Sequence, residues 1–114
     1  MRFMARAPTS PTPEAVALQA KALGERIRAA RTRRKLRRMD LAERTSLSRS
    51  TVEAIERGDL GTGLGAYLRA LWALGLEQEM SIVADPGLDR DGLSLELSAQ
   101  SKRVRVQRKV DNDF

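Results

Sequence analysis

The stretch RTSLSRSTVEAIERG, residues 44–58, decides the fold. It carries five hydroxyl side chains and then a short helical pattern that a glycine closes. Ser48 is the expected N-cap of this helix, because its hydroxyl can accept a hydrogen bond from a free backbone N–H group in the first turn. Gly58 is the expected stop, since glycine readily adopts the left-handed conformation that ends many helices. The stretch therefore predicts a short helix that runs to about Arg57.

The residues around this helix have the spacing of a helix-turn-helix. That motif needs a small residue where two helices cross, a tight turn, and two apolar residues on the inner face of the second helix. The places are filled in order by Ala42, Ser46, Leu47, Val52 and Ile55. The start of the second helix would face a DNA groove and has to be polar, which accounts for the hydroxyl side chains. The pattern predicts DNA binding.

Composition limits the other functions. A chain of 114 residues that is 41% hydrophobic can hold one modest core. It contains no cysteine and no histidine, which removes thiol chemistry, imidazole bases and the commonest metal ligands. We therefore expect no enzyme activity, no metal and no cofactor. The chain also lacks the apolar run of about 18 residues that a membrane span needs and any signal-peptide pattern at its start, so a cytoplasmic protein without a membrane partner is expected.

Charge is unevenly distributed along the chain. Residues 1–57 hold 14 Lys/Arg and 6 Asp/Glu, residues 58–92 hold 2 and 6, and residues 93–114 hold 5 and 3. A basic half followed by an acidic quarter indicates one face for a polyanion and another for a different partner. For the run RTRRKLRR alone, a solvated helix surface is an equally good interpretation.

The remaining segments predict three regions. Residues 1–13 contain three prolines and are expected to form a disordered arm, residues 14–84 the DNA-binding domain, and residues 85–114 a C-terminal tail. Within the domain, helical spacing predicts four helices besides the one after Ser48. The inward residues expected in each are Leu23, Ile27 and Ala30; Leu41, Ala42 and Thr45; Leu64, Leu68 and Leu71; and Leu76, Met80 and Val83.

Three boundary features complete this reading. Asp40 lies early in the second helix, where its charge suits the positive end of the helix dipole. Thr62 is the expected cap of the fourth helix and Gly75 its stop. The tail, with LSLELSAQSKRVRVQ at its centre, leaves strand, helix and disorder open.

Residues 21–80 as a whole resemble the DNA-binding domain of the Xre and lambdoid phage repressor family. The segment LAER...LSRSTVEAIERG carries the resemblance. It implies an all-α, five-helix, lambda-repressor-like helix-turn-helix domain with a flexible N-terminal arm and a C-terminal tail. The segments GLGAYLRALWALGLEQE and DPGLDRDGL...KRVR most resemble the antitoxin branch, the HipB-like regulators that partner HipA-like kinase toxins.

The resemblance also implies roles for individual residues. Arg49, Ser50 and Ala54 match the base-reading positions, and arginine can bind guanine O6 and N7 in a bidentate way. The alternative for Arg49 is a phosphate contact. Arg38 matches a phosphate-contacting position, and the further expected phosphate contacts are Ser48, Thr51, Arg37 and Lys35.

The resemblance implies structural roles as well. Arg31 and Glu56 match a buried ion pair between the first and third helices. Ser46 stands where the family usually has a turn glycine, and a non-glycine residue in the left-handed conformation costs about 1 kcal/mol. The expected dimer contacts are Tyr67, Leu71, Trp72 and Met80, with a place in the core as the alternative for Tyr67 and Trp72.

Three functional readings follow. The chain is expected to bind a double-stranded DNA operator as a homodimer and to repress transcription, as the antitoxin of a type II toxin-antitoxin operon that neutralises a HipA-like toxin kinase. One alternative is a stand-alone Xre-family repressor. The other is an interaction module that sequesters a toxin and binds DNA only secondarily.

Overall fold

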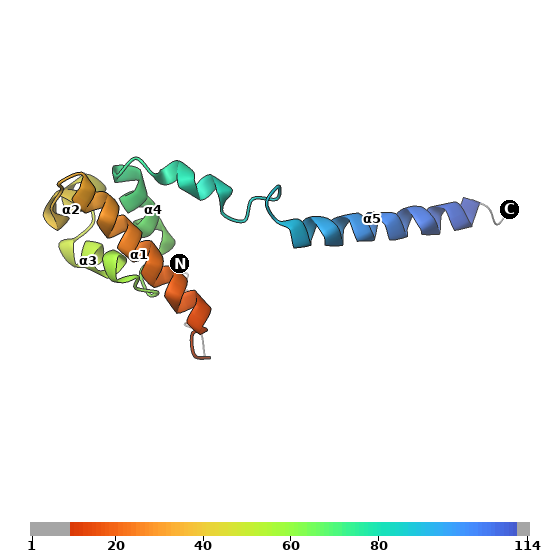
Figure 1. The fold of residues 1–114 in the computed structure, drawn as a ribbon, viewed down its shortest axis with the longest axis horizontal. Helices are drawn as coiled ribbons and strands as arrows, with labels where there is room; N and C mark the ends of the chain where they lie inside the picture. Colours follow the sequence, from red (N-terminus) through yellow and green to blue (C-terminus); the bar gives the residue numbers. More distant parts are fainter. Residues whose placement is uncertain (1–9, 112–114) are drawn as a thin grey trace, which may run out of the picture. The chain divides into compact units, whose positions relative to one another are not determined.

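The computed structural model describes residues 10–111, and every regular element in that range is a helix (Figure 1). The elements are α1 (Glu14–Arg33), α2 (Arg38–Thr45), α3 (Arg49–Arg57), α4 (Leu64–Ala73), the 3₁₀-helix η1 (Glu77–Ile82) and α5 (Arg90–Asp111). The prediction of an all-α chain is confirmed. The arm expected over residues 1–13 lies outside the described residues up to residue 9, and no helix includes residues 10–13.

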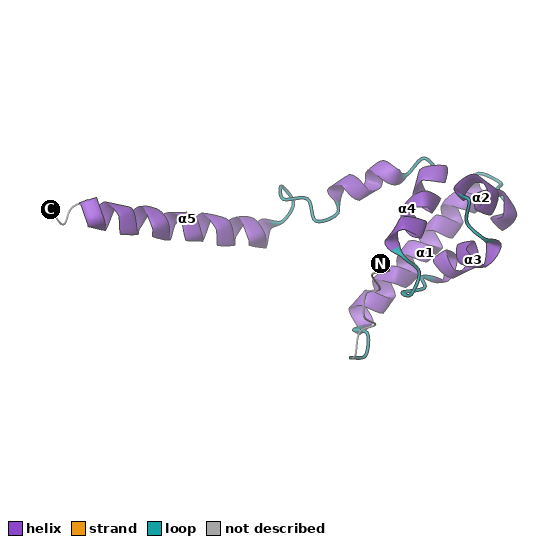
Figure 2. Cartoon of the chain, turned by 180° about the vertical axis from the view of Figure 1, so that it is seen from behind, coloured by secondary structure: helices purple, strands orange, loops and turns teal. Residues whose placement is uncertain are grey.

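The chain divides into two compact units between Glu77 and Gln78. In the first unit α1 packs on α3, α2 packs on α3 and α4, and short loops join the helices (Figure 2). Its fully buried side chains are Ile27, Leu41, Val52 and Ile55. They come from three different helices, so the expected inner faces of α1, α2 and α3 meet in one core. Leu23 lies at its edge and is only half-buried.

All four α-helices of the first unit end in the same way. In each, a residue one or two positions after the helix has a positive φ, and the N–H group of the next residue donates to a carbonyl five residues earlier, as from Leu47 to Ala42 at 3.1 Å. The left-handed residues are Lys35, Ser46, Gly58 and Gly75. Gly58 and Gly75 are the stops that the sequence predicts. Ser46 takes the turn position with φ 59° despite its side chain, as expected.

Two glycines bring the backbones of α1 and α3 into contact. A Cβ atom at Gly24 would lie 2.5 Å from the carbonyl oxygen of Ile55, and one at Gly58 would lie 2.5 Å from that of Ala20. Real Cβ atoms do not approach so closely, so only glycine allows this crossing. The last turn of α3 is thereby fixed against α1.

The predictions for α4 need two corrections. Its buried residues are Tyr67, Ala70 and Leu71, followed by Leu74, whereas Leu64 is 63% exposed. Nearly the whole surface of this helix is apolar, so spacing alone does not choose the inner face. Polar contacts set its rotation instead, because the Tyr67 hydroxyl donates to the carbonyl of Asp59 at 2.7 Å.

The predicted cap of α4 is also wrong. The N-cap residue is Gly63, and the Thr62 hydroxyl donates instead to the Asp59 carboxylate at 2.7 Å. Thr62 therefore stabilises the loop before α4 rather than the first turn of the helix.

The second unit begins within η1. The expected fifth helix is a 3₁₀-helix that ends at Ile82, and Val83 is 61% exposed. Leu76 and Val83 lie outside η1, so the α-helical spacing that assigns Leu76, Met80 and Val83 to one inward face does not apply. None of the residues of η1 is buried. The tail, whose conformation the sequence leaves open, forms the helix α5.

Candidate nucleic-acid interface

The helices α2 and α3 form the helix-turn-helix that the sequence predicts. Ala42 is 4% exposed, and Val52 and Ile55 are fully buried, so the small and apolar positions meet inside the unit. Ser46 makes the turn in the left-handed conformation. The opposite side of α3 is exposed at its first turn, where Arg49 and Ser50 lie. This geometry presents the start of α3 to solvent.

Three hydroxyl groups gather at the N-terminus of α3. The Ser48 Oγ accepts from the backbone N–H of Thr51 at 3.1 Å and thus caps the helix as predicted. It also lies 3.0 Å from the Ser50 Oγ and 2.8 Å from the Thr51 Oγ1. Free N–H groups and the helix dipole favour anions at such an end. The cluster is therefore suited to phosphate oxygens.

Arg49 is held by a carboxylate on its own helix. Its Nε lies 3.3 Å from the Glu53 Oε1, one turn further along α3, and its side chain is 60% exposed. This ion pair is made through Nε and not through the two terminal amino groups of the guanidinium. Those two amino groups are the part of arginine that binds guanine in a bidentate way. Ala54, the third expected base-reading residue, is half-buried.

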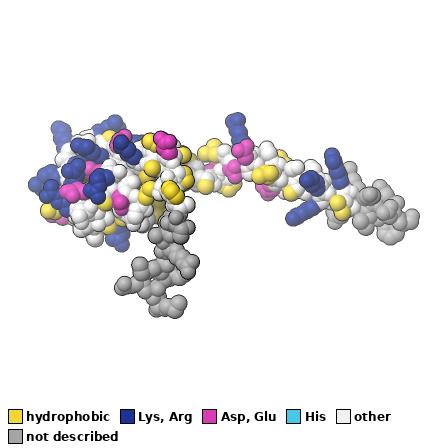
Figure 3. All heavy atoms as spheres, turned by 90° about the horizontal axis from the view of Figure 1, so that it is seen from below, with side chains coloured by type: hydrophobic (Ala, Val, Ile, Leu, Met, Phe, Trp, Pro, Cys, Tyr) yellow, Lys and Arg dark blue, Asp and Glu magenta, His cyan; other side chains and the backbone are white. Residues whose placement is uncertain are grey.

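An open pocket of about 480 Å³ lies between the first turns of α2 and α3. It is lined by Arg31, Arg37, Arg38, Met39 and Arg49. Four guanidinium groups around one depression offer many N–H donors to a phosphate, and the carboxylates of Asp40, Glu53 and Glu56 offset part of their charge. In the space-filling view, Lys and Arg side chains gather over the four-helix unit (Figure 3). The pocket joins the expected phosphate contacts at the start of α2 to Arg49, the expected base-reading residue.

The buried ion pair between Arg31 and Glu56 is present. The Arg31 Nε donates to the Glu56 Oε2 at 2.6 Å and the Arg31 Nη2 to Oε1 at 3.0 Å. The Arg38 Nε also donates to Oε1, at 3.1 Å. Burial raises the pKa of Glu56, but the hydrogen bonds from the two arginines outweigh it and leave this pKa below its ordinary value. One carboxylate thus ties together α1, α2 and α3.

Arg38 therefore has a structural partner in addition to its predicted phosphate contact. Its side chain is 35% exposed, so part of the guanidinium remains at the surface while Nε is bound to Glu56. The carboxylate fixes the direction in which the rest of the group points. The sequence predicts only Arg31 as a partner of Glu56. Because a carboxylate can accept several hydrogen bonds, the arginine at the start of α2 could have been predicted as a second partner.

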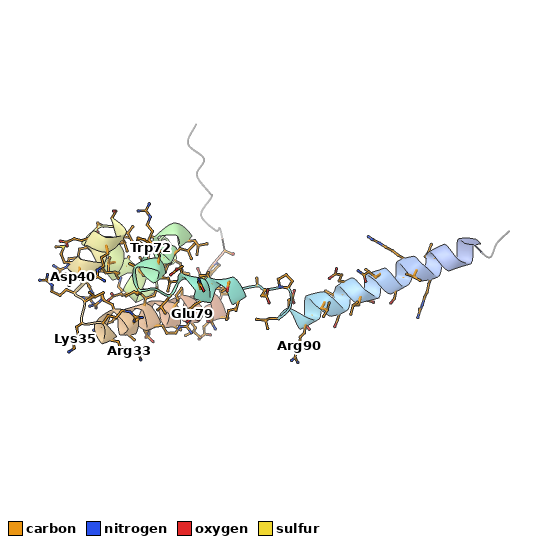
Figure 4. All side chains as sticks on the ribbon, turned by 90° about the horizontal axis from the view of Figure 1, so that it is seen from above. Arg33, Lys35, Asp40, Trp72, Glu79 and Arg90 are labelled. Carbon is orange, nitrogen blue, oxygen red and sulfur yellow. The ribbon has the colours of Figure 1, made fainter. Side chains whose placement is uncertain are left out.

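Arg37 and Asp40 cap the start of α2. The backbone N–H of Arg37 donates to the Asp40 Oδ2 at 2.7 Å, and its guanidinium donates to both carboxylate oxygens. The hydrogen bond from the Arg37 side chain, with that from its backbone, lowers the pKa of Asp40. Arg33, Lys35 and Asp40 lie at the same end of the unit (Figure 4). The exposed Lys35 carries a further positive charge at this end of the unit, whereas Arg37, which lines the pocket, is paired with Asp40.

The expected dimer contacts divide into two groups. Tyr67 and Leu71 are 7% and 6% exposed, so they belong to the core of one chain and have almost no surface left for a partner. For Tyr67 the core is thus the alternative that burial favours, and Leu71 lies there too. Trp72, by contrast, is 61% exposed on α4 (Figure 4), and Met80 is half-buried in η1. Leu64, Leu68 and Trp72 follow one another at four-residue spacing, so they form a stripe on the surface of α4.

No helix within residues 10–111 has the length and apolar character that crossing a bilayer requires.

The comparison with protein families agrees with the helix-turn-helix geometry. No curated protein and no solved structure matches the chain. The model of the helix-turn-helix domain family matches residues 22–81, a range that contains α2, α3, α4 and most of α1. The chain belongs to the helix-turn-helix domain family, and a domain of this kind indicates a DNA-binding regulator.

Proposed function

We propose that this protein is a sequence-specific transcriptional repressor that binds a DNA operator as a homodimer. The observation that carries the proposal is the placement of Arg49 and Ser50 at the exposed start of α3, beside a pocket lined by four arginines. A helix of this kind enters the major groove with its N-terminal residues toward the bases. In this proposal the chain acts by binding and catalyses no reaction.

The two sides of the pocket have different tasks. Arg49, paired with Glu53, reads a guanine, while Ser50 and Ala54 contact neighbouring base edges. Arg38, held by Glu56, binds a backbone phosphate and sets the register of α3 in the groove. The other phosphate contacts come from Arg37 and Lys35 on one side and from the hydroxyls of Ser48 and Thr51 on the other.

The dimer is supported by the apolar surface of α4. Leu64 and Trp72 are both more than 60% exposed and share one side of the helix with Leu68. Trp72 is the central contact in this proposal, and Met80 is a further contact from η1. A two-fold symmetric dimer requires two half-sites about 34–36 Å apart, one turn of DNA.

The proposal is tested by selection from a random pool of duplexes with the unaltered chain, Arg49→Ala and Arg38→Ala. We expect Arg49→Ala to relax the preference at one base pair in each half-site, because it removes a base contact. Arg38→Ala should weaken binding to all sequences alike, because it removes a phosphate contact. Thermal unfolding controls for the loss of the Arg38–Glu56 hydrogen bond. The same altered base preference in both variants would contradict these roles.

The narrower proposal is that the chain is a HipB-like antitoxin that regulates its own operon and neutralises a HipA-like kinase. It is supported by the sequence resemblance and by the second compact unit, which is not required for binding to a single half-site. Truncation after Ala84 should leave binding to one half-site within about tenfold, because tail charges supply only screened attraction. The same truncation should abolish capture of the kinase. Retained capture by the truncated chain would show that the tail is not the kinase-binding segment, whereas no capture by the full chain would favour a stand-alone repressor.

A further inference from the structure

The helix α5 displays apolar side chains that no described part of the chain buries. Leu93, Leu97 and Val104 are 48%, 54% and 47% exposed, and Leu95 and Val106 are 73% and 64% exposed. The first three are the less exposed group. A 22-residue helix with such residues at its surface is typical of one that packs against a partner.

The three less exposed residues, together with Gln100, follow a heptad pattern. Leu93, Leu97, Gln100 and Val104 are separated by four, three and four residues, so they form one stripe along α5. Leu95 and Val106 lie on the opposite side of the helix. The first stripe has an uncharged glutamine in its middle, whereas the same spacing from Leu95 through Ala99 leads to Lys102. The stripe from Leu93 to Val104 is therefore the better packing face.

Charge along α5 determines the orientation of a partner helix. The first half carries Asp91 and Glu96 with Arg90 and is net negative, and residues 101–106 carry Lys102, Arg103 and Arg105 with no acidic residue. A parallel copy would place the basic halves side by side, where they repel. An antiparallel copy places each basic half against an acidic one. We propose that α5 pairs in antiparallel orientation with α5 of a second copy of this chain.

The spacing of the stripe fixes the register of this pair. Leu93 lies opposite Val104 of the second copy, and Leu97 lies opposite Gln100 of the second copy. Glu96 and Arg103 then flank the apolar stripe on the same side, and Glu96 of each copy faces Arg103 of the other. Such flanking charges select the partner and its orientation. By symmetry the pair contains this contact twice.

The pairing is a contact between copies that is separate from the α4 surface. It rests on the proposed function only in that a dimeric repressor gains from it: two chains on adjacent half-sites bring their α5 helices together at high effective concentration. The pairing itself requires no DNA. A test without DNA therefore distinguishes its failure from a failure of operator recognition.

The first experiment measures self-association of the full chain by sedimentation equilibrium without DNA. Glu96→Arg and Arg103→Glu should each raise the dimer dissociation constant by about tenfold, because each creates two like-charge contacts. The double variant Glu96→Arg/Arg103→Glu should return to within about threefold, since the opposite charges face each other again. Arg105→Glu is the matched control, because it makes the same charge change away from the stripe. Helix content by circular dichroism checks that α5 remains folded.

The second experiment tests the orientation directly. The chain has no cysteine, so introduced thiols are the only ones present. In the antiparallel pair Ser94 of one copy faces Ser101 of the other, and the double variant Ser94→Cys/Ser101→Cys should form a covalent dimer on oxidation. Within one chain these positions are about 10 Å apart along the helix, too far for a disulfide. Either single variant should link poorly.

Three results would overturn the proposal. The first is a dimer constant that the single charge reversals leave unchanged or that the double variant fails to restore. The second is a chain that stays monomeric up to about 100 μM, well above the range of micromolar affinity. The third is efficient linking by a single cysteine variant, which would show a parallel pair.

Discussion

At the scale of single residues, the helix ends carry strain that the sequence places there. Ser46 and Lys35 both adopt a positive φ, at 59° and 57°, a conformation that glycine adopts without cost. Ser46→Gly should therefore stabilise the first unit by about 0.5–1 kcal/mol. This gain corresponds to a rise in the melting temperature of about 2–8 °C. The melting temperatures of Ser46→Gly and Ser46→Ala are compared, because alanine keeps the strain. Equal stability of the two variants would contradict strain at Ser46.

Glu56 makes stability depend on pH. Its pKa in the folded chain is lower than the ordinary value of 4.5, so the ion network stabilises the fold fully above about pH 4.5 and this contribution is lost as pH falls through the folded pKa. Glu56→Gln should cost about 3–5 kcal/mol at pH 7, because it leaves Arg31 buried without a carboxylate. The difference from the unaltered chain should shrink in acid. Chemical denaturation from pH 7 to pH 2 checks this, and a constant difference would exclude Glu56 as its source.

At the scale of elements, the crossing of α1 and α3 depends on backbone contact. Gly24→Ala should prevent or severely weaken folding, because its Cβ would lie within 2.7 Å of three backbone atoms of α3 and the residue that follows it. Gly65→Ala is the matched control. Nothing lies within 4 Å of that position, and alanine favours a helix, so the control should gain about 0.5–1 kcal/mol. Circular dichroism and thermal unfolding of both variants provide the measurement, and a stable Gly24→Ala chain would disprove the close crossing.

The elements also show how far sequence reasoning reaches. The helices α2 and α3 were predictable because cap, turn and inner face all depend on neighbours close in sequence, such as Ser48 with Thr51. The rotation of α4 was not, because it is set by contacts from Tyr67 to Asp59 and from Arg69 to the carbonyl of Thr45. The second arginine on Glu56 escaped prediction for the same reason. In α5, alternating apolar residues are compatible with a strand as well as with a helix.

At the scale of the whole molecule, charge should dominate affinity for DNA. Residues 1–57 carry eight more positive than negative charges, and four arginines line the pocket between α2 and α3. Binding releases counterions from phosphates, so raising salt from about 50 to 200 mM should weaken it by about a hundredfold or more. Fluorescence anisotropy with a labelled duplex measures the slope. A flat response would contradict a phosphate-binding surface.

The close crossing at Gly24 and Gly58 makes α3 act as a lever. The last turn of α3 contacts the backbone of α1, which cannot move aside. Its first turn is packed through the side chain of Val52, which can change its conformation. A helix of nine residues is about 13 Å long, so a tilt of about 5° at the Gly58 end moves Arg49 by roughly 1 Å. A bidentate contact tolerates about half that displacement. Substitutions beneath α3 that the fold survives should therefore change the affinity for an operator more than they change stability.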